Sequence, residues 1–574
     1  MKPEYLPLTH SEIKKKGWSS VDVVLVTGDA YVDHPSFGVA IIARVLEAAG
    51  FSVAILSQPD WHSKEDFQRF GRPNLFFGIT SGNMDSMVNK YTSLRKVRND
   101  DAYSEGGLPF RRPDRATIVY AHRAREACRG VPIILGGVEA SLRRFAHYDY
   151  WSDSVRHSIL IDSKADLLVF GMGERQILEI ARRLKSGQSI EKIRDVRGTT
   201  FCLGEREAFY LSGTRTLPSF EEVVRQSEKF SLATKIIHEE TNPYNARPLL
   251  QYHGKRAIVS LPPALPLDER EMDEIYMLPF TRAPHPVYTK TIPAYEMIKN
   301  SVTILRGCFG GCSFCSIALH QGRIVQSRSE GSVLAEARKI RGTVSDLGGP
   351  TANMYRMGCA REKALTACRR LSCLYPTVCK NLNTDHESLI ELMRKVRCLP
   401  GIKHVFVSSG IRMDLALLSP EYIREIAHHH TSGHLKVAPE HVSRHVLDLM
   451  RKPSSETFEQ FATLFTQYSK EAGKRQYLIP YIISAHPGSR IEDEVELALF
   501  LKKWNFRPRQ IQDFLPSPMD IATSMYYTGI DPYSGKRIVV TKGEGEKRLH
   551  RALIQFFKKE NRSLVRKMFS NRVR

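Results

Sequence analysis

Three cysteines, Cys308, Cys312 and Cys315, fall within the single short stretch CFGGCSFC. Thiolates are the usual protein ligands of iron–sulfur clusters. A four-iron cluster with four protein thiolates is normally an electron carrier, whereas three thiolates leave one iron open to a substrate or cofactor. The CxxxCxxC spacing therefore predicts a [4Fe–4S] cluster with an open iron, which is a place for chemistry.

The residues between these cysteines also suit a cluster. Gly310 and Gly311 give the chain the conformational latitude to curl around a small inorganic cube. Zinc is an alternative, with His320 available as a fourth ligand, but structural zinc sites favour two CxxC-like pairs over one triplet. Redox-active or buried thiols are a second alternative, and they need no triplet.

Composition limits the class of protein. A chain of 574 residues with 42% hydrophobic residues should divide into about three globular domains. It has no apolar run near the ~20 residues that span a bilayer, so we expect no membrane partner and a cytoplasmic location. Seven of the ten cysteines lie between Cys308 and Cys379, which favours metal ligation in a reducing compartment. The net charge of +22 makes RNA a possible partner, although the charge is spread along the chain and a generally basic protein explains it equally.

The first 190 residues alternate between apolar runs and an amphipathic segment. Such runs recur before small or glycine-rich turns, at residues 23–27, 52–56, 75–79, 131–135 and 166–170. This pattern predicts an α/β fold, with a Rossmann-like parallel sheet over residues 1–190 and a ligand at the carboxyl ends of its strands. NAD is disfavoured, because the stretch FGMGE at residues 170–174 lacks the third glycine of a dinucleotide fingerprint.

The cysteine loop closely resembles that of radical S-adenosylmethionine (SAM) enzymes. The stretches QDFLPSPMDIATSMYYTGIDPYSGK and EKRLHRALIQFF further resemble the YgiQ-type radical SAM proteins, and this likeness covers essentially the whole chain. It implies that SAM binds the open iron and that reduction yields a 5′-deoxyadenosyl radical, which abstracts hydrogen from an unknown substrate. It also implies a reducing electron donor such as a flavodoxin or ferredoxin.

The rest of the chain divides into three further parts. Residues 191–289 are predicted as a linker or bridging region, because the periodic pattern loosens there and prolines recur, at Pro262, Pro263, Pro266, Pro279, Pro284 and Pro286. The resemblance implies a partial (β/α) barrel at residues 290–515, followed by a small basic C-terminal extension at residues 516–574. We expect barrel strands near residues 301–305, 404–408, 435–438 and 477–483. The extension either caps the barrel or binds RNA or an acidic partner.

Cobalamin is an alternative cofactor. The stretches HPSFG, LGGVEAS and FGMGE look like the cobalamin-binding-type domain that precedes many radical SAM barrels. The pattern DxHxxG of that domain is absent, however, because Asp33 and His34 are adjacent and Gly38 lies four residues past the histidine. Cobalamin-dependent methyl transfer is thus one rival function, and a non-catalytic iron–sulfur or zinc protein that binds nucleic acid is another.

Candidate SAM contacts follow from the resemblance and from fold analogy. Phe314 is expected beside the adenine, and Gly348-Gly349 stands where the family has a Gly-Gly-Glu element, with Pro350 in place of the glutamate. Polar residues after later strands are candidates for the ribose and the methionyl carboxylate, with capping or surface roles as the alternative: Ser409, Arg412 and Glu440.

Four further cysteines lie in an insertion at residues 357–385, which has little regular periodicity. They are Cys359, Cys368, Cys373 and Cys379. An auxiliary iron–sulfur cluster or a zinc ion would fold such a segment, which has little apolar material of its own. The alternative is that these thiols pack or serve elsewhere, since their spacing is wider than in paired CxxC motifs.

Overall fold

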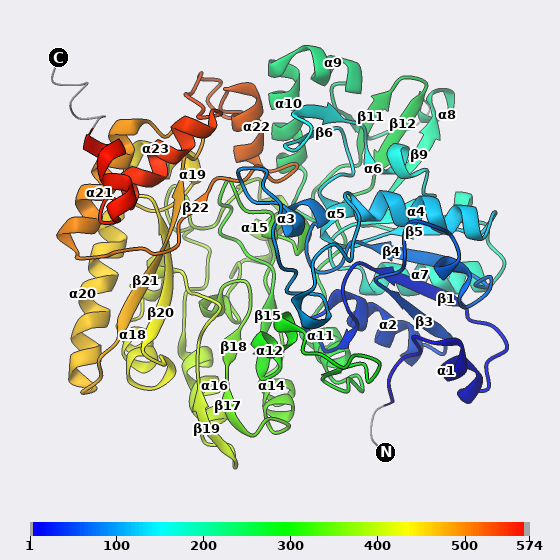
Figure 1. Ribbon diagram of the computed structural model, residues 1–574, viewed down its shortest axis with the longest axis horizontal. Helices are drawn as coiled ribbons and strands as arrows, with labels where there is room; N and C mark the ends of the chain where they lie inside the picture. Colours follow the sequence, from blue (N-terminus) through cyan, green and yellow to red (C-terminus); the bar gives the residue numbers. More distant parts are fainter. Residues whose placement is uncertain (1–3, 210–211, 567–574) are drawn as a thin grey trace.

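The computed structural model describes residues 4–209 and 212–566, and it has an α/β fold in two halves. Figure 1 shows the N-terminal half, in blue and cyan, beside a second half that runs from green to orange. The C-terminal segment, in red, lies against the outer end of the second half (Figure 1). In the described part of the chain, none of the helices combines the length and apolarity needed to cross a bilayer.

The N-terminal half is built on one sheet, to which the described residues contribute nine strands. Five of these are parallel neighbours, in the order β3 (Val53–Ser57), β1 (Val23–Thr27), β4 (Phe76–Thr80), β5 (Ile133–Leu135) and β8 (Leu167–Val169). The chain leaves β1 for β3 on one side and returns for β4 on the other. Ligands of open parallel sheets bind at such a switch point, beyond the carboxyl ends of the strands.

Alternating residues of these strands supply two apolar layers. Val23 and Leu25 of β1 belong to the core that contains helices α2 (Gly38–Ala48) and α7 (Glu174–Lys185). Val24 and Val26 belong to the core with α4 (Ala116–Ala127). Because successive side chains of a strand point to opposite faces, continuous apolar runs are what a sheet covered on both faces requires.

The sheet continues beyond residue 190, which corrects the linker predicted for residues 191–289. The added strands are antiparallel at β8–β9–β12–β11, and they are β9 (Thr199–Gly204), β10 (Arg215–Thr216), β11 (Leu249–His253) and β12 (Arg256–Ser260). Strands β11 and β12 form a hairpin that turns at Gly254, whose φ is +59°. The prolines that suggested a linker follow this hairpin.

The second half is a partial barrel whose strands lie side by side in chain order. They are β14 (Ser301–Thr303), β17 and β18 (Gly342–Val344, Asp346–Gly348), β19 (Ile402–Val405), β20 (His434–Glu440), β21 (Tyr477–Ser484) and β22 (Gln512–Asp513), and they pair in parallel. The connecting helices include α14 (Glu330–Ala337), α16 (Glu387–Arg397), α20 (Ser455–Glu471) and α21 (Ile491–Lys503). Parallel strands joined through helices put all their carboxyl ends at one edge.

The C-terminal extension packs on both halves. Helix α22 (Ile521–Thr528) contacts α10 (Ser227–Glu239) of the first half, and α23 (Glu544–Ile554) contacts α21 of the barrel. Ile554 is fully buried. These contacts favour the cap that was predicted as one of two roles for this segment.

Candidate functional site

The three-cysteine loop lies at the carboxyl edge of the barrel. It follows β15 (Leu305–Arg306) and precedes the short helix α13 (Ile317–His320), and its three thiols are free and partly buried. Burial raises the pKa of Cys308 and of Cys315, and the charge of Cys312 raises both pKa values further. The charge of Cys312 thus acts on both other thiols of the loop.

Close packing shapes this loop. Gly311 has a φ of +65°, and a Cβ atom there would lie 2.5 Å from the carbonyl oxygen of Leu371 in the cysteine-rich insertion. The backbone N–H of Gly310 points at the Cys308 sulfur, with an N···Sγ distance of 3.4 Å. Glycine is thus required at 311 by both conformation and contact.

Arg412 lies beside the cysteine loop, and two of its donors are already bonded to a carboxylate of the protein. Its Nε and Nη2 donate to the two carboxylate oxygens of Asp414 at 2.9 and 2.6 Å, and its Nη1 points at the Cys312 sulfur at 3.5 Å. The side chain is 9% exposed. A buried guanidinium at this position stabilises a thiolate, while Asp414 offsets its charge. Sequence reasoning missed Asp414, although an acidic residue two positions past Arg412 was a readable signal.

Glu440 lies at the end of β20 near the same guanidinium. Burial raises the pKa of the Glu440 carboxyl, and the charges of Lys452 and Arg412 oppose this rise. Lys452 Nζ is 3.9 Å from Glu440 Oε1. Arg412, Glu440 and Lys452 thus form a buried charged group at the barrel edge.

The predicted glycine pair and Ser409 come together at this edge. The N–H of Gly349 donates to Ser409 Oγ at 3.4 Å, and a Cβ atom at Gly348 would overlap that oxygen. Asp346 accepts the backbone N–H groups of Ser408 and Ser409, and burial raises the pKa of the Asp346 carboxyl. Asp346 is a second residue that sequence reasoning did not select.

Phe314 packs on His486, which follows strand β21. Its ring centroid is 6.1 Å from that of His486, and burial lowers the pKa of His486 to about 3.

Close by, Asp520 of the C-terminal extension accepts the Ser316 hydroxyl at 2.9 Å. Burial raises the Asp520 pKa well above its usual range, and within the described residues its Oδ1 atom has no hydrogen-bond partner. The extension therefore places a buried carboxyl beside the loop.

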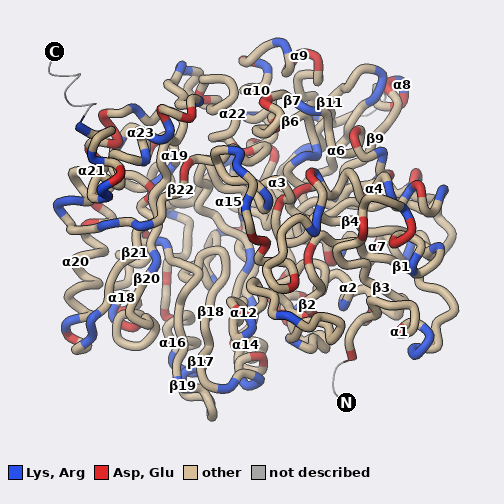
Figure 2. Tube along the Cα trace, in the orientation of Figure 1, with Lys and Arg blue, Asp and Glu red and all other residues tan. Residues whose placement is uncertain are grey.

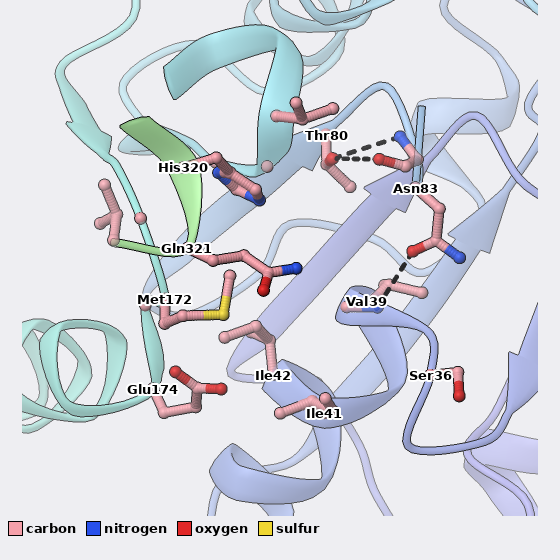
Figure 3. Close-up of a pocket in the computed structure, with 18 of the residues that line it drawn as sticks. Ser36, Val39, Ile41, Ile42, Thr80, Asn83, Met172, Glu174, His320 and Gln321 are labelled. Atoms are coloured by element: carbon pink, nitrogen blue, oxygen red, sulfur yellow. Dashed lines mark hydrogen bonds between the residues drawn. The ribbon is translucent and has the colours of Figure 1, made fainter. Parts of the chain in front are cut away.

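A cavity of about 500 Å³ lies where the two sheet edges meet. Loops after β1, β4, β5 and β8 line it from the first half, and Thr303, Leu305, Gly349 and Pro350 line it from the barrel. Figure 3 shows its mainly apolar wall at Ile41 and Ile42 of α2, with Asn83 and Thr80 at the far end. Asn83 Oδ1 accepts the N–H of Gly38 at 3.2 Å, which fixes one corner of the cavity.

His320 and Gln321 project into this cavity from the segment that follows the cysteine loop (Figure 3). Burial lowers the pKa of His320 to about 4, and its Nδ1 lies 3.1 Å from Ser141 Oγ. The imidazole is thus neutral near pH 7. Pro35 and Ser36 line the cavity. The buried His34, which was compared above with the histidine of the DxHxxG pattern, is outside the lining.

The four cysteines of the insertion are free and partly buried. Burial raises the pKa of Cys373 to about 11; nearby Arg323 opposes this rise, and the charges of Cys379 and Cys368 add to it. Cys359 is held differently, since its thiol donates to the carbonyl of Arg361 at 3.3 Å. Across residues 4–209 and 212–566, no three His, Cys, Asp or Glu side chains form a preformed site for a single metal ion.

Family models account for nearly the whole chain. A model described as Radical SAM N-terminal matches residues 5–301, one for the Radical SAM superfamily matches residues 302–501, and a domain of unknown function matches residues 509–574. The fold and the site therefore define a radical SAM enzyme, whose cofactors are a [4Fe–4S] cluster and SAM.

Individual relatives narrow the class. UPF0313 protein blr7973 of Bradyrhizobium diazoefficiens is 52% identical, over 98% of this chain and 88% of that protein. UPF0313 protein YgiQ of Salmonella typhimurium is 49% identical, over 98% of this chain and 87% of that protein. The chain belongs to this UPF0313, or YgiQ, family, as the sequence resemblance predicted.

One solved structure supports the arrangement of the halves. It is the radical SAM methyltransferase TsrM of Kitasatospora setae, with cobalamin and a [4Fe–4S] cluster bound. The match has a TM-score of 0.51 and 14% sequence identity, and covers 88% of this chain and 74% of that one. At this identity the likeness concerns the fold.

Proposed function

We propose that Cys308, Cys312 and Cys315 bind the [4Fe–4S] cluster and that the enzyme cleaves SAM to abstract a hydrogen atom from its substrate. The observation that carries this proposal is the position of the three free, partly buried thiols in one loop, which follows β15 at the carboxyl edge of the barrel. When bound and reduced, the cluster supplies the electron that splits the SAM sulfonium into methionine and a 5′-deoxyadenosyl radical.

The surrounding residues hold the charges in this site. Arg412 keeps a positive charge at the Cys312 sulfur, and the Gly310 N–H keeps a donor at the Cys308 sulfur. Gly348, Gly349 and Ser409 form the rim on which SAM is proposed to lie. Asp414 occupies two of the donors of Arg412, so we do not assign recognition of the methionyl carboxylate to Arg412. We assign recognition of the methionyl amino group to nearby acceptors, Glu440 among them.

The test is anaerobic reconstitution with iron and sulfide, reduction, and measurement of 5′-deoxyadenosine formed from SAM. Wild-type protein should form it, and Cys312→Ala should not. Cys398→Ala is the matched control, because Cys398 is a free, exposed cysteine outside the loop, and it should behave as wild type. Equal product from wild type and Cys312→Ala would overturn the proposal.

Cobalamin-dependent chemistry is the second candidate, and the cavity favours it. Cobalamin is a large ring that would need apolar walls, close backbone approach and an entry at the switch point of the first sheet. Ile41 and Ile42 supply such walls, the glycine-rich loops at 136–137 and 171–173 supply the approach, and His320 presents a neutral imidazole. When bound there, cobalamin would supply a carrier for a methyl group beside the barrel edge.

Retention of cobalamin by the full chain tests this candidate. The full chain is needed because the sheet extends to Ser260 and barrel residues line the cavity. Co-purification of one cobalamin per chain after gel filtration supports the candidate. Complete loss of cobalamin on gel filtration, with the [4Fe–4S] cluster retained, rejects it.

The electron donor, the cellular location and RNA as a partner are proposed from less specific observations. A low-potential donor such as a flavodoxin or ferredoxin is proposed to reduce the cluster in the cytoplasm. Figure 2 shows Lys and Arg distributed over both halves with Asp and Glu between them, so the net charge of +22 forms no single stripe in this view. RNA as a partner is accordingly supported by net charge alone, and salt-dependent binding would test it.

A further inference from the structure

A second, smaller cavity of about 70 Å³ adjoins the large one. Its lining residues fall in four ranges of the chain besides Arg144: 170–176, 241–243, 263–267 and 318–326. Four residues line both cavities, and they are Gly171, Met172, His320 and Gln321. The two cavities therefore share one wall, which the segment after the cysteine loop helps to form.

The lining of the small cavity is basic. Among the described residues that line it are three arginines, Arg144, Arg175 and Arg323, but neither an aspartate nor a glutamate. The charge of Arg175 is offset by Glu271, whose Oε1 accepts the Arg175 Nε donor at 2.6 Å. Arg144 and Arg323, in contrast, form no salt bridge within residues 4–209 and 212–566. Two guanidinium charges at this cavity thus lack a carboxylate partner in the described part of the chain.

Arg144 is a buried cation that its neighbours hold in place. It is 5% exposed, and its guanidinium carbon lies 4.5 Å from the centre of the Phe170 ring. Its Nη1 donates to the carbonyl of Ser141 at 2.6 Å, while its Nε has no hydrogen-bond partner among the described residues. Burial lowers the pKa of Arg144 to about 9. Because an unpaired charge in the interior is unfavourable, an anion in the cavity would stabilise this side chain.

Arg323 and Gln176 add further donors to the same lining. Arg323 is 7% exposed, and its guanidinium makes neither a salt bridge nor a side-chain hydrogen bond within the described residues. Gln176 of α7 is 3% exposed, and its Nε2 has no hydrogen-bond partner in the part of the chain that the structure describes. Buried polar groups are normally hydrogen-bonded, so donors left over around one cavity indicate a polar ligand.

We propose that Arg144, Arg323 and Gln176 bind a phosphate group in the small cavity. Guanidinium groups bind phosphate through paired, charge-assisted hydrogen bonds, and the amide supplies one more donor. Two cations and an amide suit a group with several charged oxygens better than they suit a carboxylate, which has two. The cavity of about 70 Å³ limits the ligand at this point to a group of about that size.

Two sources could bring a phosphate group to this cavity. The first is the phosphodiester in the nucleotide tail of cobalamin, reached along the wall that the two cavities share. This source rests on the second candidate function above. The other source is free phosphate or a small phosphate ester. The phosphate site itself depends neither on SAM cleavage nor on cobalamin.

Equilibrium binding to the full chain at constant ionic strength tests this site with three probes. They are inorganic phosphate, cobinamide phosphate, and cobinamide, which lacks the phosphate. We expect wild type to bind inorganic phosphate, to bind cobinamide phosphate about tenfold more tightly than cobinamide, or both. A preference for cobinamide phosphate identifies the corrinoid tail as the source. Binding of inorganic phosphate without that preference identifies a free phosphate.

Variants of the two arginines locate the site. Arg144→Met and Arg323→Met should each weaken the binding of inorganic phosphate, or the preference for cobinamide phosphate, by about tenfold. Arg270→Met is the matched control, because it removes the same charge from an exposed pair with Glu274 outside the cavity. It should keep the wild-type affinities.

Several outcomes would contradict the phosphate site. Wild type that neither binds inorganic phosphate nor distinguishes cobinamide phosphate from cobinamide overturns it, and so does wild-type affinity in either arginine variant. If Arg144→Met fails to fold, Arg323→Met decides, because its substitution leaves no salt-bridge partner among the described residues. A chain that binds inorganic phosphate through these arginines but no corrinoid would reject the second candidate function and leave the phosphate site standing.

Discussion

Two edges of parallel strands meet at the cavity, and their side chains differ in kind. The edge of the N-terminal sheet offers apolar walls, glycine-rich loops and a few polar groups, among them the acidic Asp29 and Glu174. The barrel edge offers thiols and buried charges, with Arg412 held between Asp414 and Cys312. Both edges come from the same rule, that parallel strands place their loops at one end. The difference teaches that the fold sets where ligands bind, whereas the loop residues set which ligand each edge takes.

The largest effect is expected at the charged edge. Arg412→Met leaves Asp414 buried without its partner, and removing one member of a buried ion pair costs about 3–5 kcal/mol. We expect a lower urea midpoint and loss of cluster iron. Arg270→Met is the control, because its pair with Glu274 is exposed, and it should change neither quantity. An unchanged iron content in Arg412→Met would mean that the guanidinium does not support the loop.

Acid and base affect the two halves in opposite directions. Burial raises the pKa of Asp29, at the cavity edge, to about 6, with Arg112 opposing and Asp101 adding. A raised pKa means that the folded state binds the Asp29 proton more tightly than the unfolded state does. The resulting stabilisation is complete below the unfolded pKa near 3.8 and is lost as the pH rises through about 6. Burial alone would raise the pKa of Glu494 at the barrel, but the nearby His441, 3.7 Å away, and the hydrogen bond with His550 lower it to about 2. That stabilisation is present above about 4.5 and is lost as the pH falls toward 2.

Single substitutions separate these two titrations. Asp29→Asn should remove a decline in stability of about 2–3 kcal/mol between pH 4 and 6, since one pKa unit is worth about 1.4 kcal/mol. Glu494→Gln should remove a decline of similar size on acidification below pH 4.5. Urea midpoints across this pH range measure both changes. If Asp29→Asn keeps the wild-type pH profile above pH 4, the N-terminal edge does not hold a protonated carboxyl.

A glycine exchange tests the contact between the loop and the insertion. Gly311→Ala places a methyl group against the Leu371 carbonyl in a left-handed conformation, at a cost of about 2–3 kcal/mol. Gly535 has a similar φ of +70° but faces open space, so Gly535→Ala reports the conformational cost alone, about 1 kcal/mol. The midpoint of thermal unfolding and the iron content should both fall further for Gly311→Ala than for Gly535→Ala. Equal losses in both variants would show that the insertion is not packed on the loop.

The smallest effect is expected from filling the cavity. Ile42→Trp narrows the apolar wall and should weaken cobalamin binding by tenfold or more, about 1.4 kcal/mol, while cluster iron stays constant. Leu499→Trp is the control, since Leu499 is 62% exposed on α21, and it should leave cobalamin binding unchanged. Equilibrium titration with cobalamin measures both variants. Unaltered cobalamin affinity in Ile42→Trp would place the ligand outside this cavity.

Local chemistry explains why the sequence predicted the cysteine loop and the buried strands. The spacing of Cys308, Cys312 and Cys315 carries its meaning within eight residues, and β1 reads as a strand because both its faces are apolar. The hairpin at Gly254 was missed, although two apolar runs around a glycine and a lysine are a hairpin signal. Prolines further along obscured that signal.

Contacts between distant segments explain what the sequence could not predict. Asp520 reaches the cysteine loop only because the C-terminal extension folds back over the barrel edge. The approach of Arg412 Nη1 to the Cys312 sulfur likewise joins residues that lie far apart in the chain. The cavity depends on residues from both halves, so no single motif encodes it.

The central claim is that the barrel edge holds a cluster with an iron open to SAM. The most direct measurement is the EPR spectrum of the reduced protein before and after SAM is added. SAM bound at an open iron should shift the g values of the cluster signal. A cluster spectrum that is identical with and without saturating SAM would contradict the account.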